Sequence, residues 1–395
     1  MRRGINDLST PCFVLDREEF ERSISGFENA LRGRFSDSIL GYSVKTNSLP
    51  YCLFIAKERG CYAEVVSSDE YELALLCGFP KNRIVYNGPM KSKESFLDAI
   101  LNGAIVNIET HRELEWLNEL PQSGSFSVGL RLNINISSVS PSDAVGENDN
   151  SRFGFSDETD EFSNALDIVS GLKNIRLSGL HLHRTAKSRS ILFYQNSLRS
   201  TCEIIAKYGL NLDYIDIGGG FFGFFMNKPT YQQYVDGFYS VLSEYKLDSL
   251  RIIVEPGNAL VASCFSFVSE VIDVKHVEEN LWFITTDGSR NDIDPFFQKS
   301  SYFYDLLTSR DTPVVCEQVI SGCTCLEYDR LFTLKDAHML STGDRILYNN
   351  VGAYTMCLSP MFIRYIPNVY VKNDNGYELI REKWTANEYI QKSKY

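Results

Sequence analysis

Residues 41–47 have the sequence GYSVKTN, and they place Lys45 at the end of an apolar run that predicts a buried strand. An ammonium group is costly to remove from water unless it is paired, neutralised or used in a reaction. The commoner explanation is that Lys45 lies at the end of the strand and reaches solvent. The alternative is that the lysine forms a Schiff base with a carbonyl group. The remainder of the sequence is needed to choose between them.

Short runs of β-branched residues alternate with amphipathic helical patterns over the first 260 residues. Ser67 and Ser92 begin two of the helical patterns and are expected N-terminal caps. Eight such repeats predict an α/β protein with a TIM-like (β/α)8 barrel, whose active site lies at the C-terminal ends of the strands. The expected strands are residues 38–45, 61–66, 83–87, 104–108, 127–134, 175–183, 212–217 and 251–255. The expected helices include residues 68–77, 92–101, 111–119, 191–208 and 230–244.

A second domain is predicted where the helical periodicity ends, at about residue 261. Short strand-like runs follow it and predict an all-β C-terminal domain. The early strand at residues 11–16 precedes the barrel and is expected to join the same sheet. We therefore expect a barrel over residues 20–260 and a β domain made of residues 1–19 and 261–395. The polar segment at residues 135–151 predicts a long loop.

Composition excludes several classes of partner. The net charge of −12 argues against binding to nucleic acid or to a membrane surface, because both favour basic patches. No apolar run reaches the roughly 18 residues needed to span a bilayer. The N-terminal sequence MRRGINDLSTP has no apolar segment after its arginines, so we expect no signal peptide. Ten cysteines are then expected to be reduced thiols in a cytoplasmic protein.

Unlike polar side chains stand at or near the ends of the expected strands. The C-terminal ends of barrel strands meet at one rim, so we expect these groups to converge there. The residues are Lys45 in the first strand, Glu64 in the second, Arg131 in the fifth, His183 in the sixth and Glu255 in the eighth.

A run of three glycines, Gly218, Gly219 and Gly220, follows the seventh expected strand. Glycines alone indicate no more than a tight turn. After strand seven, however, they stand where such barrels commonly bind phosphate, and bare backbone N–H groups can approach a phosphate closely. His181 shares a side of its strand with His183 and is expected to be a satisfied structural histidine deeper in the barrel. A zinc site would need further ligands at suitable spacing, and we find none in the sequence.

A lysine, a phosphate-binding loop, an imidazole and a carboxylate together describe a pocket for pyridoxal 5′-phosphate. In such a pocket Lys45 would hold the cofactor as an internal aldimine, and His183 would stack on the pyridine ring. Glu255 would pair with the ring nitrogen and keep it protonated, because a nearby negative charge favours the charged form. This interpretation explains the lysine in GYSVKTN.

The chain resembles the fold-type III decarboxylases that depend on pyridoxal phosphate, the group of ornithine, diaminopimelate and arginine decarboxylases with an alanine-racemase-like barrel. The resemblance extends over nearly the whole chain. Each motif is a modest signal, and their order makes the set a strong one. The motifs are YSVKTN (42–47), AEVVSSDE (63–70), GLHLH (179–183), DIGGGF (216–221), VEPGN (254–258), SGCTCLEYD (321–329), GD (343–344) and NVGAYTM (350–356).

The resemblance implies roles for individual residues. Lys45 is implied to be the Schiff-base lysine, with Glu64, Arg131 and His183 behind the cofactor. The phosphate-binding set is implied to be Gly218, Gly219, Gly220, Gly257 and Tyr354. The substrate-contacting set is implied to be Asp294, Asp329 and Tyr354.

Cys325 matches the cysteine that, in this family, enters the partner subunit's site and protonates the carbanion after carbon dioxide leaves. A homodimer with shared active sites is therefore implied. Two alternatives stay open: Cys323 is close enough to take this role, and a free cysteine is by default a small buried hydrophobe.

One departure from the family pattern concerns the phosphate. The family's EPGR is EPGN here, so Asn258 replaces an arginine that normally contacts the phosphate. Loss of such a charge-assisted contact costs roughly 1.5–3 kcal/mol. Arg184 is our candidate replacement, and Lys187 is a weaker one.

The other departures concern the substrate. Leu326 follows Cys325, where enzymes for basic amino acids usually have an acidic residue. Asp294 stands where diaminopimelate decarboxylases place a carboxylate-binding arginine, which argues against a distal carboxylate and for a cationic or hydroxylated substrate. The family's Phe-Asn pair is Phe362-Ile363 here.

The sequence thus predicts α-decarboxylation of an amino acid with a polar or cationic side chain. One alternative is an amino-acid racemase or epimerase on the same fold, although those enzymes pair the ring nitrogen with arginine rather than with a carboxylate. A second alternative is a homologue that binds the cofactor without turnover. A third is an aldolase-type enzyme that uses Lys45 without the cofactor, which leaves the glycine run and Glu255 unexplained.

Overall fold

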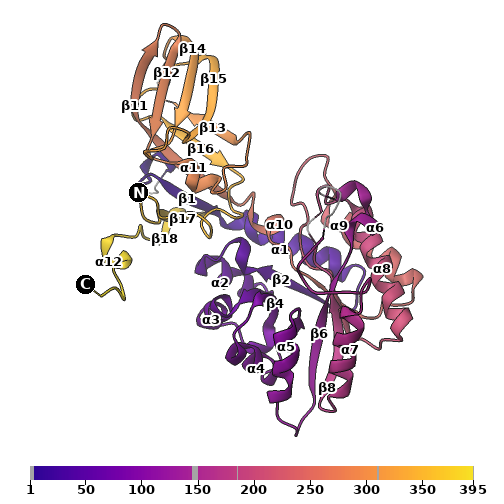
Figure 1. Ribbon diagram of the computed structural model, residues 1–395. Coiled ribbons are helices and arrows are strands. Elements are labelled where there is room, and N and C mark those ends of the chain that lie inside the picture. The colour runs from indigo at the N-terminus through magenta and orange to yellow at the C-terminus, as the bar shows by residue number, and fades with distance from the viewer. Residues whose placement is uncertain (1–3, 145–149, 185, 309–310, 395) are drawn as a thin grey trace. The chain divides into compact units, whose positions relative to one another are not determined.

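The computed structural model describes residues 4–144, 150–184, 186–308 and 311–394. The chain divides into two compact units, and each is described by itself. The barrel unit is residues 22–260, and the β unit is residues 1–21 together with residues 261–395. Figure 1 follows both units from the N-terminus in indigo to the C-terminus in yellow.

Eight parallel strands form the ring of the barrel unit. Neighbouring strands pair in the order β5-β4-β3-β2-β10-β9-β8-β6, and pairing of β5 with β6 closes the ring. A ninth, two-residue strand, β7 (Phe155–Ser156), pairs with β6 outside this ring. The ring strands are β2 (Ser38–Ser43), β3 (Tyr62–Ser67), β4 (Ile84–Met90), β5 (Ile105–Ile108), β6 (Phe126–Asn133), β8 (Ile175–His181), β9 (Tyr214–Asp216) and β10 (Arg251–Val254).

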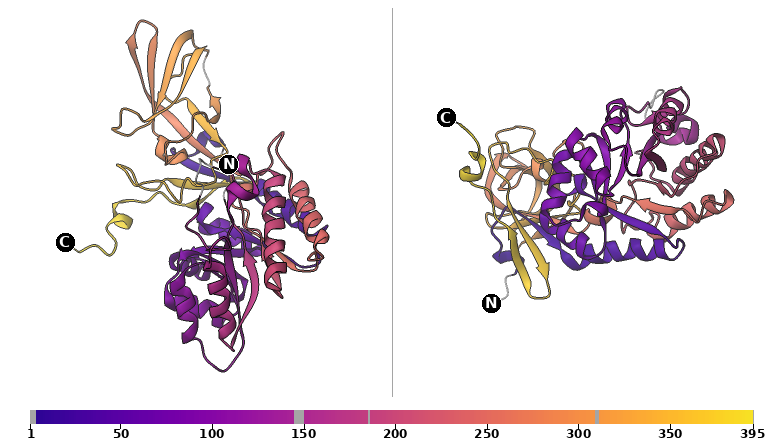
Figure 2. Two further views of the ribbon diagram at one scale, coloured as in Figure 1. Left: turned by 45° about the vertical axis from the view of Figure 1, so that its right-hand side comes forward. Right: turned by 90° about the horizontal axis from the view of Figure 1, so that it is seen from below.

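Helices lie outside the strands of the barrel unit (Figure 2). The caps expected from the sequence are present, because Ser67 accepts a hydrogen bond from the Glu70 amide and Ser92 from the Ser95 amide. The helices are α1 (Arg17–Arg32), α2 (Pro50–Glu58), α3 (Ser68–Leu76), α4 (Lys93–Leu101), α5 (His111–Trp116), α6 (Ile136–Val139), α7 (Glu161–Gly171), α8 (Ile191–Tyr208), α9 (Tyr231–Glu244) and α10 (Asn258–Val261).

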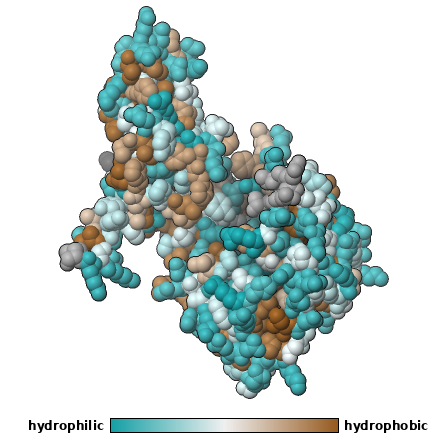
Figure 3. Space-filling view, in the orientation of Figure 1, coloured by the Kyte–Doolittle hydropathy of each residue, from teal (hydrophilic) through white to brown (hydrophobic). Residues whose placement is uncertain are grey.

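An aromatic cluster fixes the segment that follows the three glycines. Phe221 is fully buried, and its ring centroid lies 4.8 Å from that of Tyr194 on α8 and 5.2 Å from that of Tyr234 on α9. Burying one such side chain contributes about 1.5–3 kcal/mol. The glycine run is thus held between β9 and a packed aromatic residue. The face of the barrel unit seen in Figure 3 is mostly hydrophilic, as expected when such side chains lie between strands and helices.

Within its described residues, the β unit has one nine-stranded sheet, the short α-helices α11 (Arg290–Ile293) and α12 (Ala386–Tyr389), and a 3₁₀ helix, η1 (Ile5–Asp7). The early strand β1 (Cys12–Asp16) pairs antiparallel with β11 (Phe265–Glu278) and parallel with β17 (Asn368–Asn373), so its predicted place in this sheet is confirmed. The predicted barrel with a separate all-β domain is likewise confirmed. The remaining strands are β12 (Leu281–Thr286), β13 (Phe303–Leu307), β14 (Val314–Ser321), β15 (Arg330–His338), β16 (Arg345–Asn349) and β18 (Gly376–Arg381).

Several local expectations need correction. Lys45 does not end β2; it lies in a 3₁₀ turn, η2 (Val44–Thr46), that follows the strand. His183 lies two residues beyond the end of β8, because the ladder ends at His181. The expected loop at 135–151 contains α6 and a further 3₁₀ turn, η5 (Pro141–Asp143), while its residues 145–149 lie outside the described residues. Among the described residues, the helices include none that is long and apolar enough to cross a membrane.

Candidate active site

Lys45 forms an ion pair at the C-terminal end of the barrel strands. Its Nζ lies 2.6 Å from Oε2 of Glu64 on β3, which also accepts a hydrogen bond of 2.6 Å from the Ser43 hydroxyl. The Lys45 side chain is 31% exposed, whereas that of Glu64 is 1% exposed. The cost of removing the ammonium from water is therefore offset by a partner, and the amine still faces an accessible space.

Two buried asparagines link Glu64 through the interior of the barrel to Glu255 and Asp216. Asn87 on β4 donates hydrogen bonds to Glu64 and to Glu255, which follows β10. Asn107 on β5 donates to Oδ1 of Asn87 over 2.8 Å and to Oδ2 of Asp216 on β9 over 3.2 Å. Asn87, Asn107 and Asp216 were not predicted to be site residues. The signal was available: like Lys45, each is a polar residue within an apolar run, in RIVYNG, AIVNIE and YIDIGGG.

His183 contacts the glycine run directly. The Gly219 amide donates a hydrogen bond of 3.0 Å to His183 Nδ1, so this nitrogen is an acceptor. Burial lowers the pKa of His183 to about 3, with further lowering by the charges of Arg131 and Lys45. The imidazole is therefore neutral and presents a flat ring beside the loop.

Arg131 on β6 positions the segment that carries His183. Its Nη1 donates to Oε2 of Glu109 over 2.7 Å, and its Nη2 donates to the carbonyl oxygen of His183 over 3.1 Å. Glu109 also accepts a hydrogen bond from the Gly88 amide. Arg131 is only 7% exposed, and the carboxylate of Glu109 balances its charge within the barrel.

The glycines allow close approach of backbone segments. A Cβ at Gly218, where φ is +73°, would lie 2.6 Å from the His183 side chain. A Cβ at Gly219 would lie 2.3 Å from the carbonyl oxygen of Glu255, and one at Gly257 would lie 2.0 Å from Oγ1 of Thr46. These positions leave no room for a side chain, so Gly218 and Gly219 leave bare backbone in the loop after β9.

Replacing Gly219 with alanine should force this loop away from Glu255. We expect the free energy of unfolding to fall by about 1–3 kcal/mol, the usual cost of overpacking. Chemical denaturation measures this change. Gly171→Ala is the matched control, because no atom lies within 4 Å of a Cβ at that position. Equal stability of the two variants would contradict the tight packing described here.

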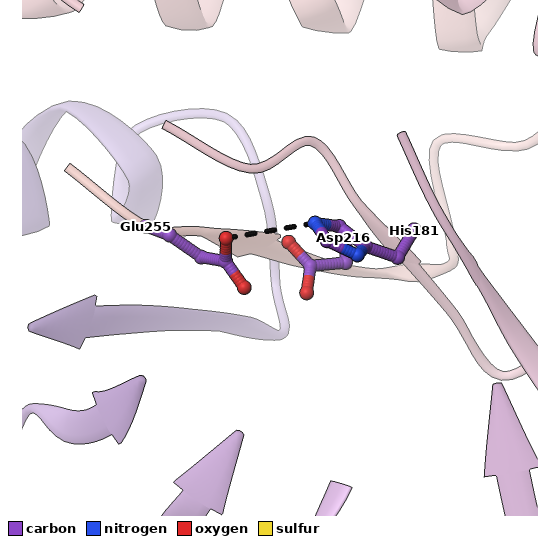
Figure 4. A group of neighbouring side chains, drawn as sticks. All are labelled: His181, Asp216 and Glu255. Atoms are coloured by element: carbon purple, nitrogen blue, oxygen red, sulfur yellow. Dashed lines mark ion pairs between the residues drawn. The ribbon is translucent and has the colours of Figure 1, made fainter. Parts of the chain in front are cut away.

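His181, Asp216 and Glu255 form a buried group inside the barrel (Figure 4). His181 Nε2 lies 3.6 Å from Oε2 of Glu255, and one ligand-type atom from each residue lies within 4.8 Å of the others. Neither ring nitrogen of His181 has a hydrogen-bond partner among the described residues. The expected satisfied histidine is thus buried, but not hydrogen-bonded there.

Arg184 and Lys187, the candidate substitutes for the missing arginine, lie in the segment that follows His183. Asn258 is partly buried and begins α10. Arg184 is partly buried directly after His183, and Lys187 is exposed three residues further on. That Arg184 takes over the phosphate contact of the arginine that Asn258 replaces stays a prediction.

Two buried carboxylates of the β unit accept hydrogen bonds from residues of that unit. Asp294 is 4% exposed and accepts hydrogen bonds from Arg290, from the amides of Gln298 and Lys299, and from Tyr302. Asp329 is 2% exposed, and the bonds it accepts come from Ser289, from the Arg290 amide and from Thr324. These contacts favour a structural role for both residues over the substrate contact expected from the sequence.

The remaining candidates of the β unit are more accessible. Cys325 is exposed on the connection between β14 and β15, whereas Cys323 is only partly exposed. Burial raises the pKa of the Cys323 thiol. Tyr354 is 43% exposed and has a φ of +54°, a left-handed conformation that non-glycine residues rarely adopt.

Comparisons with known proteins agree with this architecture. The family described as "Pyridoxal-dependent decarboxylase, pyridoxal binding domain" matches residues 17–262. The chain is 27% identical to a probable chloroplastic diaminopimelate decarboxylase of Oryza sativa subsp. japonica, over 97% of this chain and 79% of the relative. It is 24% identical to the diaminopimelate decarboxylase of Methanocaldococcus jannaschii, over 97% and 91% of the two chains.

Two solved structures share the fold. The crystal structure of the M. jannaschii diaminopimelate decarboxylase has a TM-score of 0.85 at 23% identity and covers 98% of this chain and 93% of its own. That of the Paramecium bursaria Chlorella virus arginine decarboxylase has a TM-score of 0.76 at 21% identity, with 92% and 96% covered. At these identities the likeness shows the fold alone.

Proposed function

Because the chain belongs to the family of pyridoxal-dependent decarboxylases, we propose that it removes the α-carboxylate of an amino acid whose side chain is polar or cationic. The observation that carries this proposal is the placement of Lys45 and Glu255. Both are linked through Asn87 at the C-terminal ends of the barrel strands, where barrel enzymes have their active sites. An amine and a buried carboxylate are the groups that the cofactor's carbonyl and ring nitrogen need.

The residues of the barrel unit fit pyridoxal 5′-phosphate. Lys45 offers the amine for its carbonyl, and Gly218, Gly219 and Gly220 offer the bare backbone that a phosphate group can approach. The neutral ring of His183 offers a flat face for the pyridine, and Glu255 offers a negative charge for its nitrogen. When bound, the cofactor supplies an electron sink for negative charge at the substrate α-carbon.

We further propose that Cys325 supplies the proton that replaces the carboxylate. Its exposure suits a group that must reach a substrate, whereas Cys323 is partly buried with a raised pKa. Cys325→Ala should lower kcat for amine formation by about 10²–10⁴-fold, the usual contribution of a positioned acid. Cys323→Ala is the matched control and should leave kcat nearly unchanged. The reverse ranking would move the role to Cys323.

The site is proposed to be shared between two subunits of a cytoplasmic homodimer, with Cys325 of the partner subunit entering the barrel site. Lys45→Ala and Cys325→Ala proteins should each be inactive alone. After mixing and subunit exchange they should recover about a quarter of wild-type activity, because half of the dimers are mixed and each has one intact site. No recovery in mixtures that do exchange subunits would show that each chain completes its own site.

The substrate is to be identified by carbon dioxide release from a panel of amino acids. The relatives' names make diaminopimelate and arginine the first members of the panel, followed by ornithine, lysine and hydroxylated amino acids. Asp294 and Asp329 are engaged within the β unit, so we assign neither of them to the substrate side chain. Release from one cationic or hydroxylated member supports the proposal; release from none of the panel overturns it.

A further inference from the structure

Asp216 is a buried carboxyl group that the proposed function does not use. It ends β9 and is fully buried. Its Oδ1 accepts a hydrogen bond of 3.0 Å from the Gly218 amide, and its Oδ2 accepts one of 3.2 Å from Asn107. On its remaining side it faces Glu255 and His181 (Figure 4). Two carboxyl groups therefore lie side by side in the interior of the barrel.

The cations around this pair are matched by other carboxylates. Lys45 Nζ lies 2.6 Å from Glu64, and Arg131 lies 2.7 Å from Glu109. Burial lowers the pKa values of both His181 and His183, so neither imidazole adds a positive charge. The phenol of Tyr214 donates a hydrogen bond to Oδ1 of Asn107.

Two adjacent carboxylates in such surroundings do not both ionise, because repulsion and burial each favour retention of one proton. Burial, followed by the neighbouring charge of Glu255, raises the pKa of Asp216. Glu255 stands at the strand end where the ring nitrogen is expected, so its charge is the one that faces the cofactor, and Asp216 lies behind it. The proton therefore belongs on Asp216, with Glu255 as its acceptor.

We propose that Asp216 is a carboxylic acid in the working protein and donates a hydrogen bond to Glu255, so that the pair holds a single negative charge. Asp216 is then a positioning residue that acts through Glu255. A carboxylate that accepts a hydrogen bond is a weaker base, so Glu255 leaves the proton on the cofactor's ring nitrogen. This last step rests on the proposed function; the shared proton does not.

A metal ion is the competing occupant, since the same three side chains lie within 4.8 Å of one another. The hydrogen bonds that Asp216 accepts from Gly218 and Asn107 already occupy a lone pair on each of its oxygens, which disfavours coordination of a metal ion. Zinc is the probe for the alternative. Stoichiometric Zn²⁺ binding by the full-length apoprotein that is lost in Asp216→Asn would overturn the proposal.

Infrared difference spectroscopy of the full-length protein, with and without cofactor, tests the proton directly. The carbonyl band of a protonated, buried carboxyl group should be present at neutral pH and should shift in D₂O. It should be absent from Asp216→Asn and unchanged in Asp213→Asn, an exposed aspartate paired with Arg176 at the surface. A wild-type spectrum without a band that depends on Asp216 overturns the proposal.

The pH dependence of unfolding gives a second readout that does not need the cofactor. A raised pKa means that the folded protein keeps a proton that the unfolded chain releases above about pH 4. The unfolding equilibrium constant of the wild type should therefore rise with pH by up to about ten-fold per unit relative to Asp216→Asn. Identical pH profiles would contradict the proposal. Should Asp216→Asn fail to fold, Glu255→Gln serves instead, and its Asp216 should ionise at a lower pH.

The protonation state of the cofactor's ring nitrogen shows whether Glu255 needs only a hydrogen-bond donor at position 216 or needs the carboxylic acid itself. Asparagine still donates to Glu255, whereas leucine cannot. The ¹⁵N signal of the bound cofactor's ring nitrogen should stay that of a protonated ring in Asp216→Asn and should shift toward the neutral form in Asp216→Leu. The kcat of the leucine variant should fall by about 10–100-fold with little change in KM. An Asp216-dependent acid band in a protein that decarboxylates nothing would uphold the shared proton and overturn only the proposed function.

Discussion

Replacing Lys45 with alanine should abolish the covalent attachment of pyridoxal phosphate and with it the visible absorbance of the bound cofactor. Lys45 is the amine paired with Glu64 at the strand ends, and alanine offers no nucleophile for the cofactor's carbonyl. We expect kcat for carbon dioxide release to fall by about 10²–10⁴-fold or more, the scale of a lost positioned group. Absorbance spectra and carbon dioxide release of the purified variant measure both effects.

The matched control for this variant is Lys93→Ala. Lys93 makes an exposed ion pair with Glu119, which is expected to contribute little. It should keep both the spectrum and the rate of the wild type. An unchanged visible spectrum in a Lys45→Ala variant that circular dichroism shows to be folded would contradict the assignment of Lys45 as the amine that binds the cofactor.

Loss of the Lys91 side chain should lower the stability of the protein strongly. It is fully buried, with its Nζ 3.2 Å from Oε1 of Glu113, and it donates to the carbonyl oxygens of Gly88 and Asn107. Lys91→Met would leave the equally buried Glu113 without its cation. Removing one partner of a buried pair typically destabilises by about 3–5 kcal/mol. Denaturant-induced unfolding measures this loss.

The double variant Lys91→Met/Glu113→Leu distinguishes an unpaired charge from lost packing. A buried ion pair replaced by apolar side chains is often close to neutral, so the double variant should be more stable than Lys91→Met alone. A double variant that is less stable than the single one would show that Lys91 acts through shape rather than charge. Lys91 also donates a hydrogen bond to the backbone carbonyl oxygen of Asn107. The single variant should therefore weaken the hydrogen bond that the Asn107 side chain donates to Asp216.

The sequence predicted the barrel because its strand and helix periods alternate eight times. It predicted that β1 joins the β sheet because this early strand precedes the eight barrel strands. One observation identified Lys45, Glu64 and Glu255: each is a charged residue in or at the end of an apolar run, where removing the charge from water is costly unless the group is paired or used in a reaction. The structure brings Lys45 to Glu64 and links both to Glu255 through Asn87.

Other features could not be read from the chain because they depend on side chains from distant segments. Nothing in the local sequence says that Asn87 and Asn107 hydrogen-bond to each other. Similarly, Asp294 was aligned with a substrate-binding position, yet Arg290 and Tyr302 satisfy it within its own segment. His181 was expected to be satisfied, and only the fold places it beside two carboxyl groups.

The central claim is that this chain removes the carboxylate of an amino acid and protonates the α-carbon once. The most direct measurement is to incubate the holoenzyme in D₂O with the substrate found in the panel, labelled with ¹³C in its α-carboxylate. We predict ¹³CO₂ and an amine that carries one deuterium at the former α-carbon, with neither formed by Lys45→Ala. Recovery of the amino acid with its ¹³C retained and deuterium at the α-carbon would contradict this account and identify a racemase.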